Sequence, residues 1–165
     1  MLSTIKTRRS IRKFDGRTIS RADLEELLTA GMYAPSAGNE QAWQFVFLDG
    51  DMFKNYLSFS KNVPQTAPCG ILICRDIGRE KYKGMNASVY DCSAAAQNML
   101  LLAHDKGLGA IWTHVFDEAK PKIKELLHLP EGIEPFCCVA VGYAQGSPAE
   151  TPDRYDVSRV HFNGW

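Results

Sequence analysis

The 165-residue sequence lacks several features that would place it in a simple functional class. It has no net charge, because 19 Lys and Arg residues balance 19 Asp and Glu residues, so composition gives no support to a nucleic-acid-binding surface. No run approaches the roughly 18 apolar residues of a membrane span, and the first residues lack the apolar core of a signal peptide. We therefore expect neither a nucleic acid nor a membrane as a partner.

The spacing of metal ligands is also absent. The five cysteines form no CxxC pair and the four histidines are scattered, so we expect no metal site. Most of the cysteines lie in apolar runs such as 71–74 and 136–139, which favours small core residues over redox-active thiols. Thiols without an obvious pairing scheme are typical of a reducing compartment, and we expect the protein in the cytoplasm.

Common catalytic motifs are missing as well. The sequence has no HExxH and no nucleophile elbow, and Gly107-Leu108-Gly109-Ala110 does not match the GxGxxG spacing of a dinucleotide-binding fold. These glycines could hold a phosphate, but a plain helix end is the better interpretation. Asp91, near the start of a predicted helix, is interpreted as a helix-dipole partner rather than a catalytic acid.

The hydrophobic pattern predicts strands mixed with helices, without strict βαβ alternation. Ser20 and Asp23 predict the start of the first helix. We expect helices near residues 20–32, 53–57, 88–106 and 117–127. We expect strands at 43–48, 70–74, 110–114 and 136–143. This order favours an α+β sheet flanked by helices, formed by one domain that spans 1–165.

Positive charge is concentrated in the segment 8–14. If this segment is extended, the side chains of Arg8, Ser10 and Arg12 face one side and Ile11 anchors the other. Two guanidinium groups beside a hydroxyl can bind a phosphate through charge-assisted hydrogen bonds. The alternative is an ordinary solvated basic segment.

Two further segments could contact a ligand. The loop 34–43 has small residues that allow close backbone approach, and its Asn39 and Gln41 could pair with the amide-like edge of a heterocycle. Arg154, after Pro152 in the C-terminal segment, could add to a phosphate site. Taken singly, an ordinary loop and a surface arginine are the better interpretations of these two features.

In their order along the chain, these motifs resemble the nitroreductase family of flavoproteins. The resemblance rests on RRSIRKF near the start, APSAGNEQAW about 25 residues later, the helix AAQNMLLLA leading into GLGAIW, and a late VGY strand. It covers nearly the whole chain, which is similar to the short members of the family.

The resemblance implies a three-layer sandwich, with a mixed but mainly antiparallel sheet flanked by helices, and an intertwined homodimer. It implies FMN bound at the dimer interface and contacted by both subunits. Residues 144–165 would then be an extension that packs on the partner subunit. NADH or NADPH would be the electron donor, and a small molecule the acceptor.

The same resemblance assigns the flavin contacts. Arg8, Arg9, Ser10 and Arg12 would bind FMN, with Arg8 and Ser10 near the phosphate and Arg12 nearer the ribityl chain and the N1/O2 edge. Pro35, Ser36, Ala37 and Asn39 would reach FMN from the other subunit. Arg154 would close on the phosphate. Residues on one strand would pass along the ring, and they are Trp112, Thr113, His114 and Val115.

The sequence departs from the family pattern at Ala42, where Pro is common, and at His114, where Gly or Glu is usual. His114 could simply fill space over the ring, or it could donate a proton or hydrogen bond to a substrate. We name no certain catalytic residue, because a flavin carries the chemistry of hydride transfer.

We therefore expect a ping-pong transfer of hydride from NAD(P)H through FMN to nitroaromatic, quinone or similar acceptors. Three alternatives remain open at this point: reductive dehalogenation, flavin fragmentation, and a non-catalytic flavin-binding or redox-sensing protein.

Overall fold

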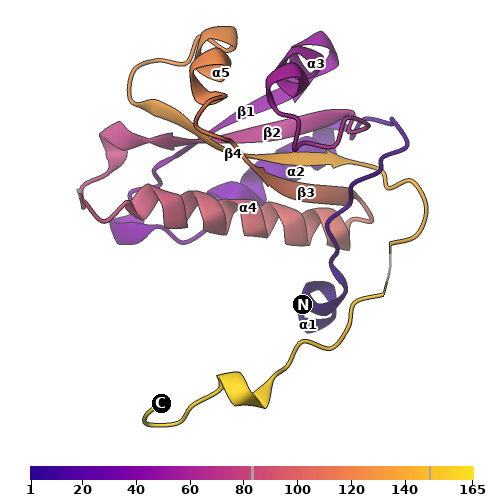
Figure 1. Cartoon of the computed structure of the whole chain (residues 1–165), viewed down its shortest axis with the longest axis vertical. Helices are drawn as coiled ribbons and strands as arrows, with labels where there is room; N and C mark the ends of the chain where they lie inside the picture. The colour runs from indigo at the N-terminus through magenta and orange to yellow at the C-terminus, as the bar shows by residue number, and fades with distance from the viewer. Residues whose placement is uncertain (83, 149) are drawn as a thin grey trace.

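A four-stranded sheet forms the centre of the protein in the computed structural model, which describes residues 1–82, 84–148 and 150–165 (Figure 1). The strands are arranged in the order β1-β2-β4-β3, and each neighbouring pair is antiparallel. Their bounds are β1 Trp43–Asp49, β2 Cys69–Asp76, β3 Gly109–His114 and β4 Ile133–Gly142. The central pair, β2 and β4, are the strands with long buried runs, as continuous apolar sequence predicts.

Helices cover both faces of this sheet. In Figure 1, α2 (Arg21–Met32) and α4 (Ala87–Asp105) lie on one face, and α3 (Gly50–Phe59) and α5 (Lys120–Leu126) lie on the other. Along β2 the side chains alternate between two cores: Ile71 and Ile73 pack on the α2/α4 side, whereas Leu72 packs on the α3/α5 side. The predicted α+β three-layer sandwich is confirmed.

Two helix boundaries, the start of α2 and the end of α4, show clear local signals. The Ser20 hydroxyl accepts a hydrogen bond from the Asp23 N–H at 3.0 Å, which confirms the predicted start of α2. Gly107 has φ +73°, which suits the residue that ends α4. The predicted start of the last helix was wrong, because α5 begins at Lys120 and Asp117 instead forms an exposed ion pair with Lys120.

The N-terminal segment binds the C-terminal end of α4 and then joins the sheet. A short helix, α1 (Leu2–Thr7), contacts α4 through Thr7 Oγ1 and His104 Nε2, which are 2.8 Å apart. Ser10 then forms a parallel bridge with Ala110, so the sheet is mixed at this edge. Gly109 permits this approach, since a Cβ there would lie 3.0 Å from the side chain of Ile11.

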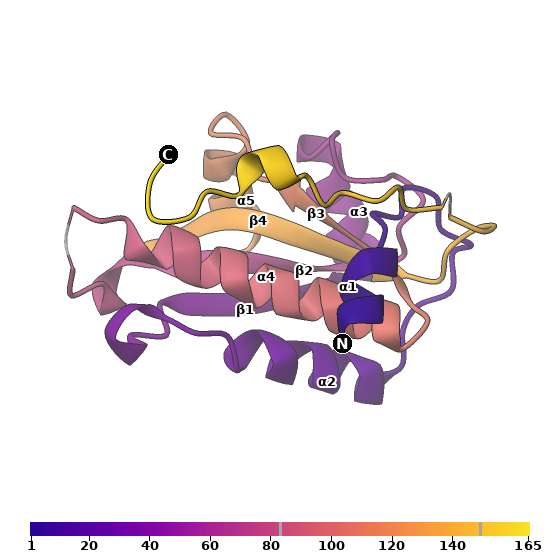
Figure 2. The ribbon, with the colours of Figure 1, turned by 90° about the horizontal axis from the view of Figure 1, so that it is seen from below.

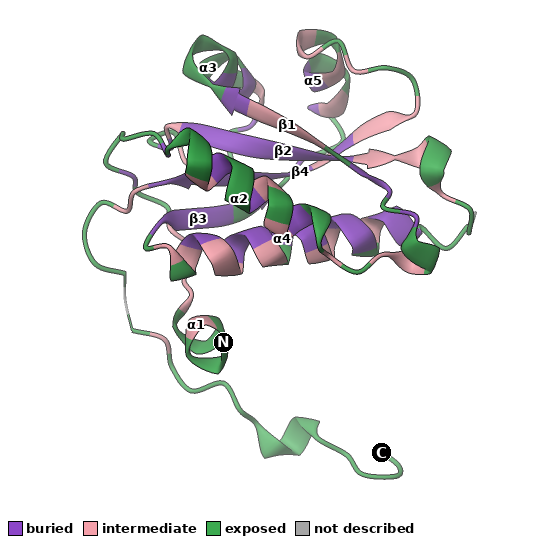
Figure 3. Cartoon of the chain, turned by 180° about the vertical axis from the view of Figure 1, so that it is seen from behind, coloured by how far each residue is buried: buried purple, intermediate pink, exposed green. Residues whose placement is uncertain are grey.

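The C-terminal segment leaves the body of the protein (Figure 3). Every residue from Pro152 to Trp165 is exposed, including Tyr155, Phe162 and Trp165, and the segment contains one short turn, η3 (Val157–Arg159). Among the residues that the structure describes, no helix is long and apolar enough to cross a membrane.

All five cysteines are buried and none forms a disulfide. Burial raises the pKa of each thiol that lies in the two cores, for example to about 12 at Cys138. A thiol that stays protonated is a poor nucleophile, so their placement agrees with the predicted role as core residues.

Candidate functional site

Two arginines that are far apart in the sequence meet beside α1. Arg8, directly after α1, and Arg154, from the C-terminal segment, line one hollow of about 510 Å³. The Arg8 guanidinium is half-buried, and its pKa is lowered by burial and by the neighbouring charges of Arg154 and Arg9. The structure therefore brings two arginines together at this hollow, which Lys6 and Asp153 also line.

Two guanidinium nitrogens of this cluster have unused hydrogen-bonding capacity. Nη1 of Arg8 and Nη1 of Arg9 are buried, and neither has a hydrogen-bond partner within the described ranges. No ion pair between described residues involves Arg8, Arg9 or Arg154. Partly buried like charges with unpaired donors fit a bound anion such as a phosphate. We call Arg8, Arg9 and Arg154 the arginine cluster.

A second hollow continues from the arginine cluster along the N-terminal segment. It is about 280 Å³ in volume, and Arg9, Ser10 and Arg12 contribute to its lining. Arg12 is exposed. Ser10 and Arg12 both line this hollow rather than the one that Arg8 and Arg154 line, so the structure does not place Ser10 beside Arg8 as expected. Arg8 and Arg12 are therefore at different ends of the basic segment, as a long ligand with separate phosphate and polar ends would require.

Strand β3 presents an open edge beside these hollows. The Ile11 N–H donates to Ala110 O at 3.0 Å, away from β4, whereas the Val115 N–H donates to Phe136 O in the opposite direction. Because backbone groups alternate along a strand, those of Trp112 and His114 face the open edge like those of Ala110. Backbone N–H groups of these two residues are therefore available to a ligand.

The side chains of β3 divide in the same alternating way. Thr113 and Val115 are buried, and the Thr113 hydroxyl donates to Cys138 O at 3.1 Å, so their side chains pack in the core. Trp112 and His114 are exposed. Of the four residues predicted here, only Trp112 and His114 can offer side chains to a ligand.

Aromatic neighbours and one amide hold the end of β3. His114 meets Phe116 edge-on, with ring centroids 5.4 Å apart, and Trp112 lies against Phe136 at 6.4 Å. Nδ2 of Asn62 donates to His114 O at 2.7 Å. Sequence reasoning missed Asn62, which lies 52 positions from its partner in an exposed loop with no distinctive motif.

The predicted ligand loop has an unusual backbone. It contains η1 (Ala37–Asn39), in which Gly38 and Asn39 have φ values of +53° and +56°, and Gln41 follows with +52°. Non-glycine residues rarely adopt this conformation, and they do so where surrounding contacts enforce it. A Cβ at Gly38 would also lie 2.9 Å from the exposed Tyr82 ring, so a larger residue there would force this ring to shift.

The structure does not bring this loop to the arginine cluster within one chain. The Ala37 N–H binds Asp91 near the start of α4, whereas Thr7, next to Arg8, binds His104 near its end. A helix rises 1.5 Å per residue, so these points are about 20 Å apart along α4. Figure 2 shows α1 beside the C-terminal part of α4, away from the loop between α2 and β1.

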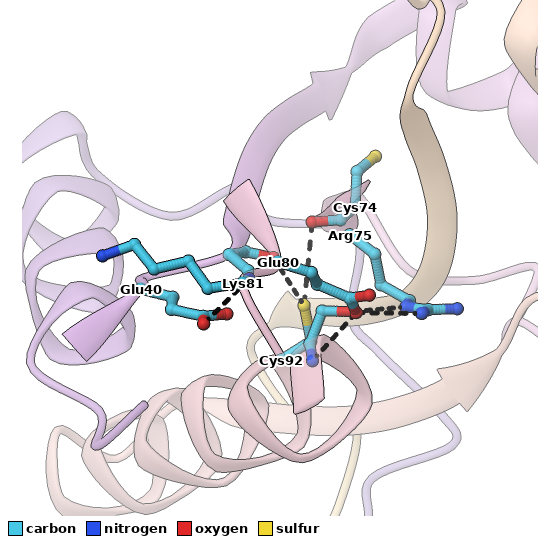
Figure 4. Close-up of polar contacts among 8 residues, drawn as sticks. Glu40, Cys74, Arg75, Glu80, Lys81 and Cys92 are labelled. Atoms are coloured by element: carbon cyan, nitrogen blue, oxygen red, sulfur yellow. Dashed lines mark hydrogen bonds and ion pairs between the residues drawn. The ribbon is translucent and has the colours of Figure 1, made fainter. Parts of the chain in front are cut away.

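Buried carboxylates that the sequence did not single out support this region. The Glu40 carboxylate accepts from the Lys81 N–H at 2.9 Å, and Glu80 binds Arg75 and Ser88 at the start of α4 (Figure 4). The hydrogen bond from Ser88, followed by that from Arg75, lowers the pKa of Glu80 despite burial. Loop, strand end and helix start are thus joined by polar contacts.

Comparison with known proteins gives a consistent result. A model described as the Nitroreductase family matches residues 5–58 and 53–143. A protein of Archaeoglobus fulgidus, named "Putative NADH dehydrogenase/NAD(P)H nitroreductase", is 40% identical over 172 aligned positions, which cover 99% of this chain and 98% of its own length. A protein of Methanothermobacter thermautotrophicus with the same name is 36% identical and covers 100% of this chain and 87% of its own length.

Solved structures show the same similarity. One from Clostridium acetobutylicum, described as "Putative NADH Oxidase", superposes with a TM-score of 0.90 at 36% identity, covering 98% of this chain and 99% of the other. One from Clostridium difficile, described as an FMN-dependent nitroreductase, has a TM-score of 0.88 at 28% identity and covers 100% of both chains.

Proposed function

This chain belongs to the nitroreductase family, and on that premise we propose that it is an FMN-dependent oxidoreductase. It would take hydride from NADH or NADPH and pass electrons to nitroaromatic, quinone or similar acceptors. One observation carries the cofactor assignment: Arg8 is half-buried between like charges and keeps an unpaired guanidinium nitrogen. A flavin phosphate would supply the missing anion.

The other predicted contact residues follow one another in the same order as the groups of a flavin, from the phosphate to the ring. Ser10 and Arg12 follow the arginine cluster along the second hollow, where a cation would stabilise negative charge on a reduced flavin. The open edge of β3 would offer the backbone N–H groups of Trp112 and His114 to the ring. When bound, FMN would supply the two-electron chemistry, accepting hydride from one substrate and releasing electrons to the next.

We further propose that each flavin is bound by two copies of this chain. The arginine cluster and the loop 35–39 lie at opposite ends of α4, so one chain cannot easily bring both to a single phosphate and ring. In a two-fold dimer, the loop of one subunit can meet the arginine cluster of the other. The exposed segment 152–165, with its aromatic side chains, would pack on the partner subunit.

The protein's side chains would have limited chemical roles. They would bind and orient the flavin, leave one face of the ring open, and exclude water from it. His114 is the one exposed ionisable side chain on β3, and it would contact the acceptor rather than the flavin phosphate. Five buried, unbridged thiols suit a reducing compartment, and we place the protein in the cytoplasm.

The visible spectrum of the purified protein tests this proposal. We expect a yellow protein, or a colourless one that retains FMN, and its yellow colour, after added FMN has been removed by gel filtration. It should bleach under anaerobic conditions with NADH or NADPH and regain its colour with menadione. A preparation that holds FMN but is reduced by neither nicotinamide would overturn the donor assignment, and one that binds no FMN would overturn the whole proposal.

A further inference from the structure

Asp91 is a buried carboxylate in the second turn of α4. It is 3% exposed, and its Oδ1 accepts a hydrogen bond from the Ala37 N–H at 3.0 Å. The other oxygen, Oδ2, is buried and has no hydrogen-bond partner in the part of the chain that the structure describes. An acid in this position is poorly suited to packing alone, because burial of a carboxylate with an unsatisfied oxygen is costly.

The contact joins α4 to the loop that has the unusual backbone. Ala37 begins η1, and the next two residues have positive φ. The far end of the loop is held separately, because Glu40 O accepts from Arg79 Nε and the Glu40 carboxylate accepts from the Lys81 N–H, both at 2.9 Å. Asp91 therefore holds the loop at Ala37, and the segment 79–81 holds it at Glu40.

The loop and α4 do not pack closely along their whole length. A hollow of about 350 Å³ separates them, lined by Ser36, Ala37, Tyr90 and Asp91 among others. The hydrogen bond from Ala37 to Asp91 therefore crosses the edge of this hollow and links the first part of the loop directly to α4.

We infer that Asp91 is a positioning residue, whose carboxylate holds the Ala37 end of the loop 35–42 in the conformation that contacts the flavin of the partner subunit. This inference rests on the proposed function. Burial raises the pKa of Asp91, and the hydrogen bond from the Ala37 N–H lowers it. Smaller effects come from the Glu40 carboxylate, which raises this pKa, and from the Ala42 N–H, which lowers it. The role requires an acceptor oxygen, which an amide also provides.

Hydrogen exchange of the loop amides tests the inference without reference to flavin. In Asp91→Ala we expect peptides covering 35–42 to exchange at least about tenfold faster, because a constraint on local opening is lost. Asp91→Asn retains an acceptor oxygen and should exchange like the wild type. Asn98→Ala is the matched control, because Asn98 Nδ2 donates to Ala30 O at 3.0 Å and so links α4 to α2 away from the loop.

Flavin binding provides the second readout. The dissociation constant for FMN should rise about 10- to 100-fold in Asp91→Ala, stay within about threefold of the wild type in Asp91→Asn, and be unchanged in Asn98→Ala. Ala37→Pro removes the donor instead of the acceptor, and the extended Ser36 (ψ 152°) tolerates a following proline. It should reproduce the loss of affinity if Asp91→Ala does not fold.

The outcomes separate the two claims. If the wild type binds no FMN, the proposed function fails, whereas the exchange experiment still tests Asp91. Wild-type exchange and wild-type FMN affinity in Asp91→Ala would overturn the inference, as would equal impairment of Asp91→Ala and Asp91→Asn. Faster loop exchange in Asp91→Ala with rescue by Asp91→Asn would support it.

Discussion

The guanidinium of Arg8 has two cationic neighbours and no acidic partner among the described residues. Burial, followed by the charges of Arg154 and Arg9, lowers its pKa, so the folded chain tolerates an unfavourable arrangement of charge there. Strained or electrostatically unfavourable positions persist where a ligand compensates for them. At the scale of single residues, this is the strongest argument that the protein binds an anion.

Replacing Arg8 should weaken flavin binding more than replacing Arg154, which is more exposed. We expect the dissociation constant for FMN to rise about 10- to 100-fold in Arg8→Ala, since hydrogen bonds to charged groups contribute roughly 1.5–3 kcal/mol. Arg159→Ala is the control, because Arg159 lies in the same C-terminal segment but pairs with Asp156. Equilibrium dialysis measures all three variants, and full FMN retention by Arg8→Ala would show that the phosphate site lies elsewhere.

The exposed imidazole of His114 allows a prediction about substrates. If it donates a hydrogen bond or proton to the acceptor, His114→Gly should lower turnover with quinones and nitroaromatics about 10- to 1,000-fold, because a positioned donor stabilises the charge that develops on the acceptor. FMN affinity and reduction by NAD(P)H should change little. Steady-state rates with several acceptors test this, and unchanged rates would leave His114 as a residue that only fills space.

At the scale of elements, the start of α4 depends on ionised Glu80. Hydrogen bonds from Ser88 and Arg75 lower the pKa of Glu80, so its stabilising contribution is present above its ordinary value of 4.5 and is lost as pH falls through the lowered value. Glu80→Gln should therefore unfold more easily than the wild type at pH 7, by roughly 1–3 kcal/mol.

The pH dependence provides the test of that account. The difference in free energy of unfolding between wild type and Glu80→Gln should shrink as pH falls below 4.5, because the wild type then loses its charged group as well. Urea denaturation across this range measures the difference. Glu118→Gln, at an exposed position, should show no such trend, and a constant gap for Glu80→Gln would refute the proposed role of its charge.

Elements with a strong local signal could be predicted from the sequence. The apolar run around Ile71–Cys74 and the cap at Ser20 led directly to β2 and α2. Helix α1 could not be found this way, since it has only six residues and none of them is buried. The start of α5 was misplaced because Asp117, a good capping residue, forms an ion pair instead.

The candidate site was predictable only in part, for a related reason. The basic segment and the small-residue loop are local patterns, and motif order was sufficient to select them. The contact between Ala37 and Asp91 joins residues 54 positions apart, and the meeting of Arg8 with Arg154 depends on the path of the C-terminal segment. Contacts of this kind are set by tertiary packing, which a single sequence does not display.

At the scale of the whole molecule, one chain carries the two segments that we propose bind flavin, the arginine cluster and the loop 35–39, at opposite ends of α4. It also carries an exposed segment with aromatic side chains that make no buried contact with its own core, such as Phe162 and Trp165. Both features are explained by a second copy, which would complete the site and cover the segment. Under this proposal, dimer formation is a condition for flavin binding.

A mixed dimer tests this central claim most directly. One subunit carries Arg8→Ala with Arg9→Ala, and the other carries Ser36→Ala with Asn39→Ala, each pair chosen so that its homodimer binds FMN weakly. If each flavin is bound by two chains, the mixed dimer combines one intact arginine cluster with one intact loop, and it should bind one FMN with wild-type affinity. If each chain binds its own flavin, both sites are damaged, and a mixed dimer without a tight FMN site would contradict the account.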